Sequence, residues 1–176
     1  MPITDNQPIK YNIRKNMKYL LLIITLLSFN AQSLELAIGS GVLPMADSTK
    51  GDVYSVTLKH DKYKYSIAWF SEYGRTPWYG WQPTWGQLMQ DEHLVASALR
   101  EIHFHNITDT LEFFIDFGFA YTSKISKVNS SRFLFTENIG FRYKSFDLYW
   151  RHTSNAGLKG ENTGEDAIIL EYSFNL

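Results

Sequence analysis

A two-residue alternation of apolar and polar side chains is the feature that most restricts the fold of this sequence. It is clearest between Leu111 and Tyr121, where every odd-numbered residue is large and apolar. Most residues between them are polar or small, and Phe114 is the exception. Successive side chains of a β-strand point to opposite faces, whereas an α-helix repeats every ~3.6 residues. The segment is therefore predicted to be a strand with one apolar and one polar face.

The same alternation recurs often enough to predict eight strands in total. It is less clear at Leu34–Gly41 and at about 94–104. The other clear segments are 54–59, 63–69, 132–143, 146–151 and 167–176. The breaks between strands are long near 42–51, 74–92, 123–131 and 154–164, and short near 60–62, 106–110 and 144–145. Long loops at one end and short turns at the other are typical of bacterial outer-membrane barrels.

Alternation by itself does not say which face of a barrel points inward. A soluble barrel that encloses a ligand turns its apolar face inward, whereas a membrane barrel turns that face toward lipid. Here the apolar faces are rich in Phe, Tyr and Trp, as aromatic girdles require. The opposite faces carry charged residues that suit a hydrated or ion-paired interior: Glu112, Asp116, Arg142 and Glu171. We therefore predict an all-β, eight-stranded, antiparallel up-and-down transmembrane β-barrel in the bacterial outer membrane.

Residues 1–33 are predicted to be an N-terminal extension and a cleavable signal peptide, with Met17 as an alternative start. Basic residues precede the apolar run Tyr19–Leu27, and small residues follow at 31–33. A basic region, an apolar region and a small-residue site form the pattern of a secretory signal. The alternative is an N-terminal anchor helix, although the run is short for a membrane span. The barrel domain would then comprise residues 34–176.

Composition excludes several classes of function. The chain has 17 Lys and Arg against 18 Asp and Glu, so it lacks the basic surplus typical of nucleic-acid binding. It has no cysteine, which excludes disulfides and cysteine-ligated metals. Its five histidines show no ligand spacing with acidic residues, so no metal and no other cofactor is predicted.

The segment that begins at His152 holds the residues on which a chemical prediction rests. His152 and Ser154 are two residues apart, so a strand places both on one face, and they continue the lipid-facing series of their strand. On the last strand the lipid-facing series leads back to Asp166, whereas Glu165 falls on the lumen face. A serine nucleophile needs a base, and the base needs an acid to orient it. Polar groups at a lipid-facing rim are costly unless they pair or serve a function.

Two short motifs in this region resemble the lipid A 3-O-deacylase (PagL) family: His-x-Ser-Asn-Ala-Gly at 152–157 and Asn-x-Gly-x-Asp at 162–166. The resemblance implies an eight-stranded outer-membrane barrel that hydrolyses the ester of the 3-hydroxyacyl chain at position 3 of lipid A. Its substrate would be the lipid A of lipopolysaccharide in the outer leaflet. It also implies a serine esterase with Ser154 as nucleophile, His152 as base and Asp166 at the position of the triad acid, where the family typically has Glu.

Both the triad acid and the oxyanion donors have an alternative assignment. Asp166 is one methylene shorter than Glu, so Glu165 is kept as the fallback acid, although the alternation of the strand places Glu165 on the lumen face. Asn162 and the backbone N–H groups of Asn155 and Gly157 are candidate donors to the oxyanion. For Asn155 and Gly157, a role in the turn at the strand end fits equally well.

Two other interpretations compete with the deacylase. One is a non-enzymatic outer-membrane barrel, either structural or a small channel. The other is a different outer-membrane lipid hydrolase or an acyltransferase. All three place the chain in the membrane, and a homodimer is compatible with each of them.

Overall fold

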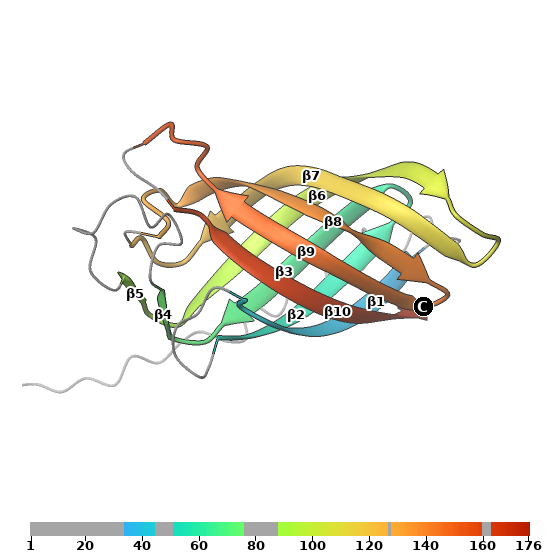
Figure 1. The fold of residues 1–176 in the computed structure, drawn as a ribbon, viewed down its shortest axis with the longest axis horizontal. Coiled ribbons are helices and arrows are strands. Elements are labelled where there is room, and N and C mark those ends of the chain that lie inside the picture. Colours follow the sequence, from blue (N-terminus) through green and yellow to red (C-terminus); the bar gives the residue numbers. More distant parts are fainter. Residues whose placement is uncertain (1–33, 45–50, 76–87, 127, 160–162) are drawn as a thin grey trace, which may run out of the picture. The chain divides into compact units, whose positions relative to one another are not determined.

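The computed structural model describes residues 34–44, 51–75, 88–126, 128–159 and 163–176. Within these residues, eight strands close into a barrel and two short strands form a separate pair (Figure 1). The barrel strands are β1 (Leu34–Val42), β2 (Asp52–His60), β3 (Tyr63–Phe70), β6 (His93–Asn106), β7 (Leu111–Thr122), β8 (Phe133–Tyr143), β9 (Phe146–Ser154) and β10 (Glu165–Asn175). The separate pair is β4 (Tyr73–Arg75) and β5 (Leu88–Gln90). The predicted signal peptide and Asn162 lie outside the described residues.

The strands pair in the order β1-β10-β9-β8-β7-β6-β3-β2, and β1 also pairs with β2, which closes the barrel. Every pairing is antiparallel. This confirms the predicted eight-stranded antiparallel barrel. The prediction missed the pair β4–β5, which interrupts the long connection between β3 and β6, because strands of three residues are too short to show an alternation. None of the residues described here belongs to a helix long and apolar enough to cross a membrane.

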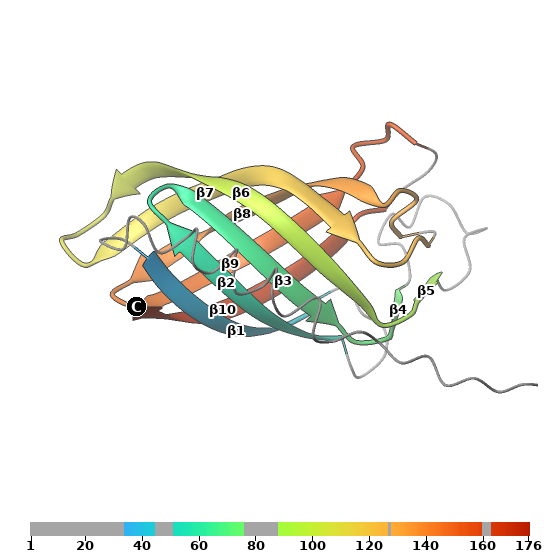
Figure 2. The ribbon, with the colours of Figure 1, turned by 180° about the vertical axis from the view of Figure 1, so that it is seen from behind.

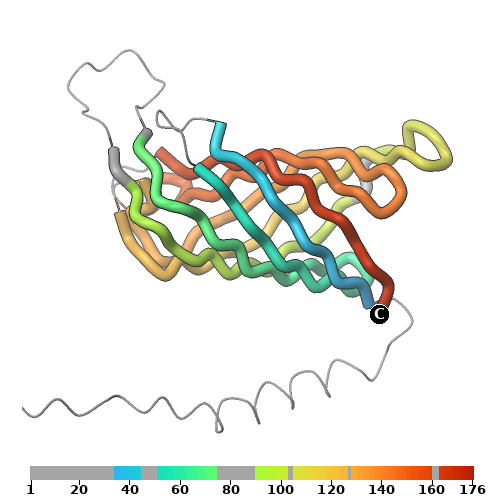
Figure 3. Tube along the Cα trace, turned by 90° about the horizontal axis from the view of Figure 1, so that it is seen from below, coloured from blue at the N-terminus to red at the C-terminus, as the bar shows by residue number. Residues whose placement is uncertain are grey.

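The short turns and the start of β1 lie at the same end of the barrel as the end of β10 (Figure 3). Glu35 pairs with Asn175, and the N–H of Leu176 donates to the carbonyl of Leu34 at 3.1 Å. Asp61 and Lys144 have positive φ angles of 53° and 56° in the tight turns β2–β3 and β8–β9, as two-residue hairpin turns require. The longer connections, including β4 and β5, are at the opposite end (Figure 2).

The apolar face of the barrel points outward and the charged face points inward. On β7, Phe119 is 65% exposed and Phe117 is 49% exposed, whereas the side chain of Asp116 is fully buried. The other barrel strands alternate in the same way. An outward apolar surface is what a barrel needs in contact with lipid, and it is the reverse of a soluble ligand-binding barrel.

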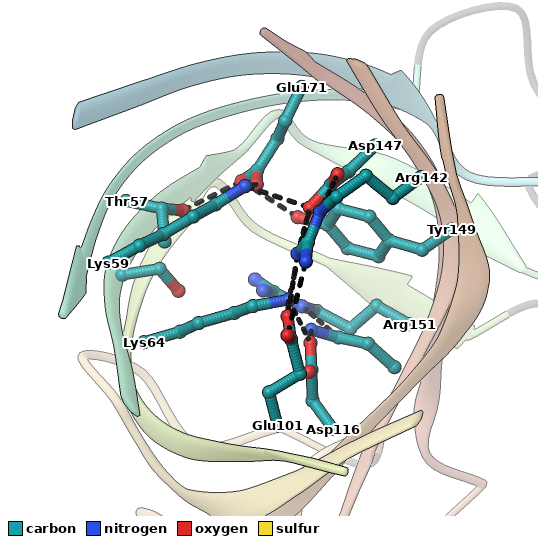
Figure 4. Close-up of polar contacts among 12 residues, drawn as sticks. Thr57, Lys59, Lys64, Glu101, Asp116, Arg142, Asp147, Tyr149, Arg151 and Glu171 are labelled. Carbon is teal, nitrogen blue, oxygen red and sulfur yellow. Dashed lines mark hydrogen bonds and ion pairs between the residues drawn. The ribbon is translucent and has the colours of Figure 1, made fainter. Parts of the chain in front are cut away.

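Ion pairs between side chains of several strands form a network in the barrel interior (Figure 4). Lys64 Nζ lies 2.6 Å from Glu101 Oε2 and 3.0 Å from Asp116 Oδ2. The Arg142 guanidinium bonds to both Glu101 and Asp147, at 2.6 Å and 2.8 Å. Because burying a charge is costly unless it is paired, this arrangement explains how a small barrel tolerates so many charged residues.

Phe114, the exception to the alternation on β7, is explained by this interior network. Its ring is fully buried among charged groups, and the Lys64 ammonium lies 4.1 Å from the ring centroid. The Arg142 guanidinium carbon lies 5.3 Å from the same centroid. Cations are attracted to the face of an aromatic ring, so a phenylalanine fits an inward position that otherwise holds polar side chains.

Candidate active site

His152, Ser154 and Asp166 lie on the outward face of two neighbouring strands, at the end of the barrel with the long loops. His152 and Ser154 are in the last three residues of β9, and Asp166 is the second residue of β10. The strands pair so that Asp166 lies directly opposite His152. Thr153, between the histidine and the serine, is fully buried on the interior face. The strand register therefore brings an imidazole and a carboxylate together beside a serine.

The His152 ring is held from two sides. Its Nδ1 lies 2.8 Å from Asp166 Oδ1, and a carboxylate only accepts, so the neutral ring carries its proton on Nδ1 and can accept another on Nε2. The ring also stacks on Trp150, with centroids 5.7 Å apart and planes at 25°. The Asp166 side chain is 7% exposed and that of His152 is 28% exposed. The imidazole thus has a defined tautomer and orientation and still reaches the surface.

Gly164 packs directly against this ring, and our sequence reasoning assigned it no role. A Cβ added to Gly164 would lie 2.5 Å from His152 Cε1, 2.9 Å from His152 Nε2 and 3.1 Å from Ser154 Cβ. The φ angle of Gly164 is +68°, in the left-handed region that favours glycine. His152 Nε2 and Ser154 therefore lie on either side of one small space that only a glycine leaves open. The signal in the sequence that could have identified this role is the position of Gly164 within the 162–166 motif, just before the last strand.

Gly164→Ala is expected to lower the rate of any reaction that uses His152 as a base by about 10–100-fold. The added methyl group would displace the imidazole, and a misplacement of ~1 Å costs up to ~10²-fold. Steady-state kinetics of the purified barrel would measure the effect. Gly157→Ala is the matched control, because Gly157 also has a positive φ of 73° but has no atom within 4 Å of an added Cβ. Equal losses in both variants would contradict this interpretation of Gly164.

The turn after Ser154 is built by Asn155. Its side chain is 2% exposed, its Nδ2 donates to the carbonyl of Lys159 at 2.8 Å, and its Oδ1 accepts from the N–H of Gly157 at 2.9 Å. In this arrangement the N–H of Gly157 is engaged within the turn. The N–H of Ala156 is directed at Ser154 Oγ, at 3.4 Å. Ala156 is therefore the residue of this turn whose backbone N–H faces the serine, and the sequence alone did not single it out.

Glu165, the fallback acid, lies on the interior face of β10. Its side chain is 1% exposed. Its carboxylate accepts from Tyr73 Oη at 2.7 Å and lies 3.1 Å from His93 Nε2. Consecutive residues of a strand point to opposite faces, so the carboxylate of Glu165 points away from the side on which Asp166 meets His152.

A groove of about 390 Å³ lies beside His152 and Ser154 on the outer surface. The rings of Phe117 and Phe135 stack along it with centroids 6.2 Å apart. Glu137, which pairs with His152 across β8 and β9, also lines it. The groove combines an apolar wall with polar groups at one end, as a site for an amphiphilic chain requires.

The family model described as lipid A 3-O-deacylase (PagL) matches residues 52–175. No curated protein matches at a significant level. Among solved structures, the crystal structure of the outer membrane enzyme PagL is similar at 16% identity and a TM-score of 0.49, covering 81% of this chain and 99% of that one. The N-terminal β-barrel domain of Pseudomonas aeruginosa OprF is similar at 12% identity and a TM-score of 0.47, covering 81% and 97%.

Proposed function

The chain belongs to the lipid A 3-O-deacylase (PagL) family and is an integral outer-membrane barrel, and we propose that it is a serine esterase acting on lipid A. Its reaction would hydrolyse the ester that holds the 3-hydroxyacyl chain at position 3. The observation that carries this proposal is the 2.8 Å contact between His152 and Asp166, beside Ser154 and on the outward face of the barrel. The triad of the proposed enzyme is thus Ser154, His152 and Asp166.

In the first half of the reaction, Ser154 Oγ attacks the carbonyl carbon of the ester. His152 Nε2 accepts the serine proton, and the adjacent carboxylate of Asp166 stabilises the imidazolium that forms. The N–H of Ala156 faces Ser154 Oγ and is a candidate donor to the oxyanion, as is Asn162. The bond between the acyl carbon and the ester oxygen then breaks. The imidazolium gives its proton to that oxygen, which leaves as the 3-hydroxyl of the glucosamine.

In the second half, water releases the acyl chain from Ser154. His152 Nε2 takes a proton from water, and the hydroxide attacks the acyl-serine carbonyl. The bond from Ser154 to the acyl carbon breaks, and the proton returns to Ser154 Oγ. The products are a free 3-hydroxy fatty acid and lipid A with a free 3-hydroxyl, so the residues of the chain suffice for the whole cycle.

The position of the site favours a lipid that lies in the membrane. The ester of an acylated glucosamine lies where the headgroup meets the hydrocarbon, and the three residues lie where β9 and β10 meet the long loops. The apolar wall formed by Phe117 and Phe135 provides a surface for the acyl chain of the substrate. A substrate held in the leaflet would therefore reach Ser154 sideways from the lipid, without entering the barrel.

The test of this proposal is the mass of lipid A in cells that make the protein. The host should carry an ester-linked 3-hydroxyacyl chain at position 3, and cells with the empty vector are the control. We expect lipid A to lose the mass of one 3-hydroxyacyl group and a free 3-hydroxy fatty acid to accumulate. A gain in mass would instead assign an acyltransferase, and fatty acids released only from phospholipids would assign a phospholipase.

A further inference from the structure

A second histidine–carboxylate pair lies inside the barrel, directly behind the candidate active site. His93 Nε2 lies 3.1 Å from Glu165 Oε2, and the two side chains are 0% and 1% exposed. Glu165 also accepts a hydrogen bond from Tyr73. The His93 ring stacks on Phe70, with centroids 5.0 Å apart and planes at 13°. All groups of this interior cluster are thus held by specific contacts.

Both ring nitrogens of His93 have polar partners. Nε2 faces a carboxylate oxygen, and Nδ1 lies 3.0 Å from the carbonyl oxygen of Asp91. The ring therefore cannot rotate without losing one of these contacts. The side-chain nitrogen of Gln90 lies 3.2 Å from Nδ1 while its oxygen is buried without a partner. Because a buried polar group is costly without its partner, removal of Glu165 would leave His93 and Tyr73 unsatisfied in the interior.

The pair connects opposite walls of the barrel. His93 begins β6 and Glu165 begins β10, and three strands lie between β6 and β10 in either direction around the barrel. Tyr73 adds a second link, from β4 to the same carboxylate. The start of β10 is therefore fixed across the interior to the β3–β6 connection and not only to its neighbours in the sheet.

The backbone of the residue fixed in this way, Glu165, adjoins the contacts of the candidate active site. Glu165 pairs with Thr153, the residue between His152 and Ser154. Its two neighbours in sequence are Gly164, which packs on the His152 ring, and Asp166, which bonds to that ring. A shift of the backbone at Glu165 would move both of these contacts at once.

From this geometry we infer that Glu165, held by His93 and Tyr73, is a positioning residue that sets the Asp166–His152 contact from inside the barrel. The inference rests on the proposed function, because it assumes that this contact serves catalysis. It also gives the segment β4–β5 an influence on the reaction, through Tyr73. Catalysis itself would still be performed by Ser154, His152 and Asp166.

The experiment compares Glu165→Ala with Glu171→Ala in the purified full-length barrel. Glu171 lies on the same strand and face, is 2% exposed, and accepts hydrogen bonds from Thr57 and Tyr149, but it is distant from His152. For Glu165→Ala we expect kcat on lipid A to fall about 10–100-fold, with KM within about twofold because the groove is unchanged. Glu171→Ala should keep kcat in the fraction that folds. Glu165→Gln, which keeps an acceptor oxygen and the side-chain shape, should recover most of the loss.

A spectroscopic measurement separates this inference from the proposed function. The proton on His152 Nδ1 should give a downfield signal in ¹H–¹⁵N spectra, identified by its loss in His152→Gln. We expect this signal to broaden or disappear in Glu165→Ala and to persist in Glu171→Ala. If Glu165→Ala does not fold, Tyr73→Phe should show the same trend with a smaller amplitude. An unchanged signal and kcat in the folded Glu165 and Tyr73 variants would overturn the positioning role alone. If a lost signal leaves kcat unchanged, the proposed triad itself is wrong.

Discussion

Ser154→Ala is expected to reduce deacylation of lipid A by about 10³-fold or more, because it removes the atom that forms the acyl-enzyme. Loss of one member of a serine triad costs nearly as much as loss of the whole triad, since the three groups act as a unit. The variant should fold normally, because the serine lies at the end of β9 on the outer surface. Lipid A from cells that make Ser154→Ala should keep the mass it has with the empty vector.

The matched control for this variant is Ser40→Ala. Ser40 is a serine on the same outward face of the barrel, in β1, where it is exposed, and it pairs with Leu170 rather than with a residue of the site. Its replacement should leave deacylation unchanged. If lipid A is deacylated equally well by the Ser154→Ala and Ser40→Ala proteins, Ser154 is not the nucleophile, and another residue of the barrel must perform the reaction.

Asp166→Asn is expected to reduce kcat by on the order of 10³–10⁴-fold. The carboxylate accepts the Nδ1 proton of His152 at 2.8 Å, whereas an amide can donate to Nδ1 and thereby stabilise the wrong tautomer. That tautomer places the proton on Nε2, so the ring can no longer take the proton of Ser154. Initial rates on detergent-solubilised lipid A would measure the loss.

Two further variants define the role of Asp166. Asp166→Glu keeps the carboxylate and introduces the residue that the family typically has, so we expect kcat within about tenfold of the parent. Asp109→Asn removes an exposed carboxylate from the turn β6–β7 at the other end of the barrel and should have no effect. Full activity of Asp166→Asn together with a near-complete loss in Glu165→Gln would reassign the triad acid to Glu165.

The outward orientation of the candidate site could be predicted because alternation is a local property. Each strand of this barrel has one face in lipid and one in the interior, so parity along the chain places His152, Ser154 and Asp166 on one side and Glu165 on the other. The charged interior was also predictable from parity, and Asp116, Arg142 and Glu171 lie there. Phe114 departs from the rule because the Lys64 ammonium packs on its ring, and this contact links strands far apart in sequence.

The sequence by itself therefore determined the number of barrel strands, the direction of their faces and which side chains share the outer rim, since these follow from the two-residue period. Only the tertiary structure decided which groups touch: Gly164 on the His152 ring, the N–H of Ala156 toward Ser154, and His93 and Tyr73 on Glu165. These contacts depend on the register between strands, on backbone angles in loops and on closure of the barrel. Closure brings β6 to face β10 across the interior, and no local pattern in the sequence encodes the resulting contact between His93 and Glu165.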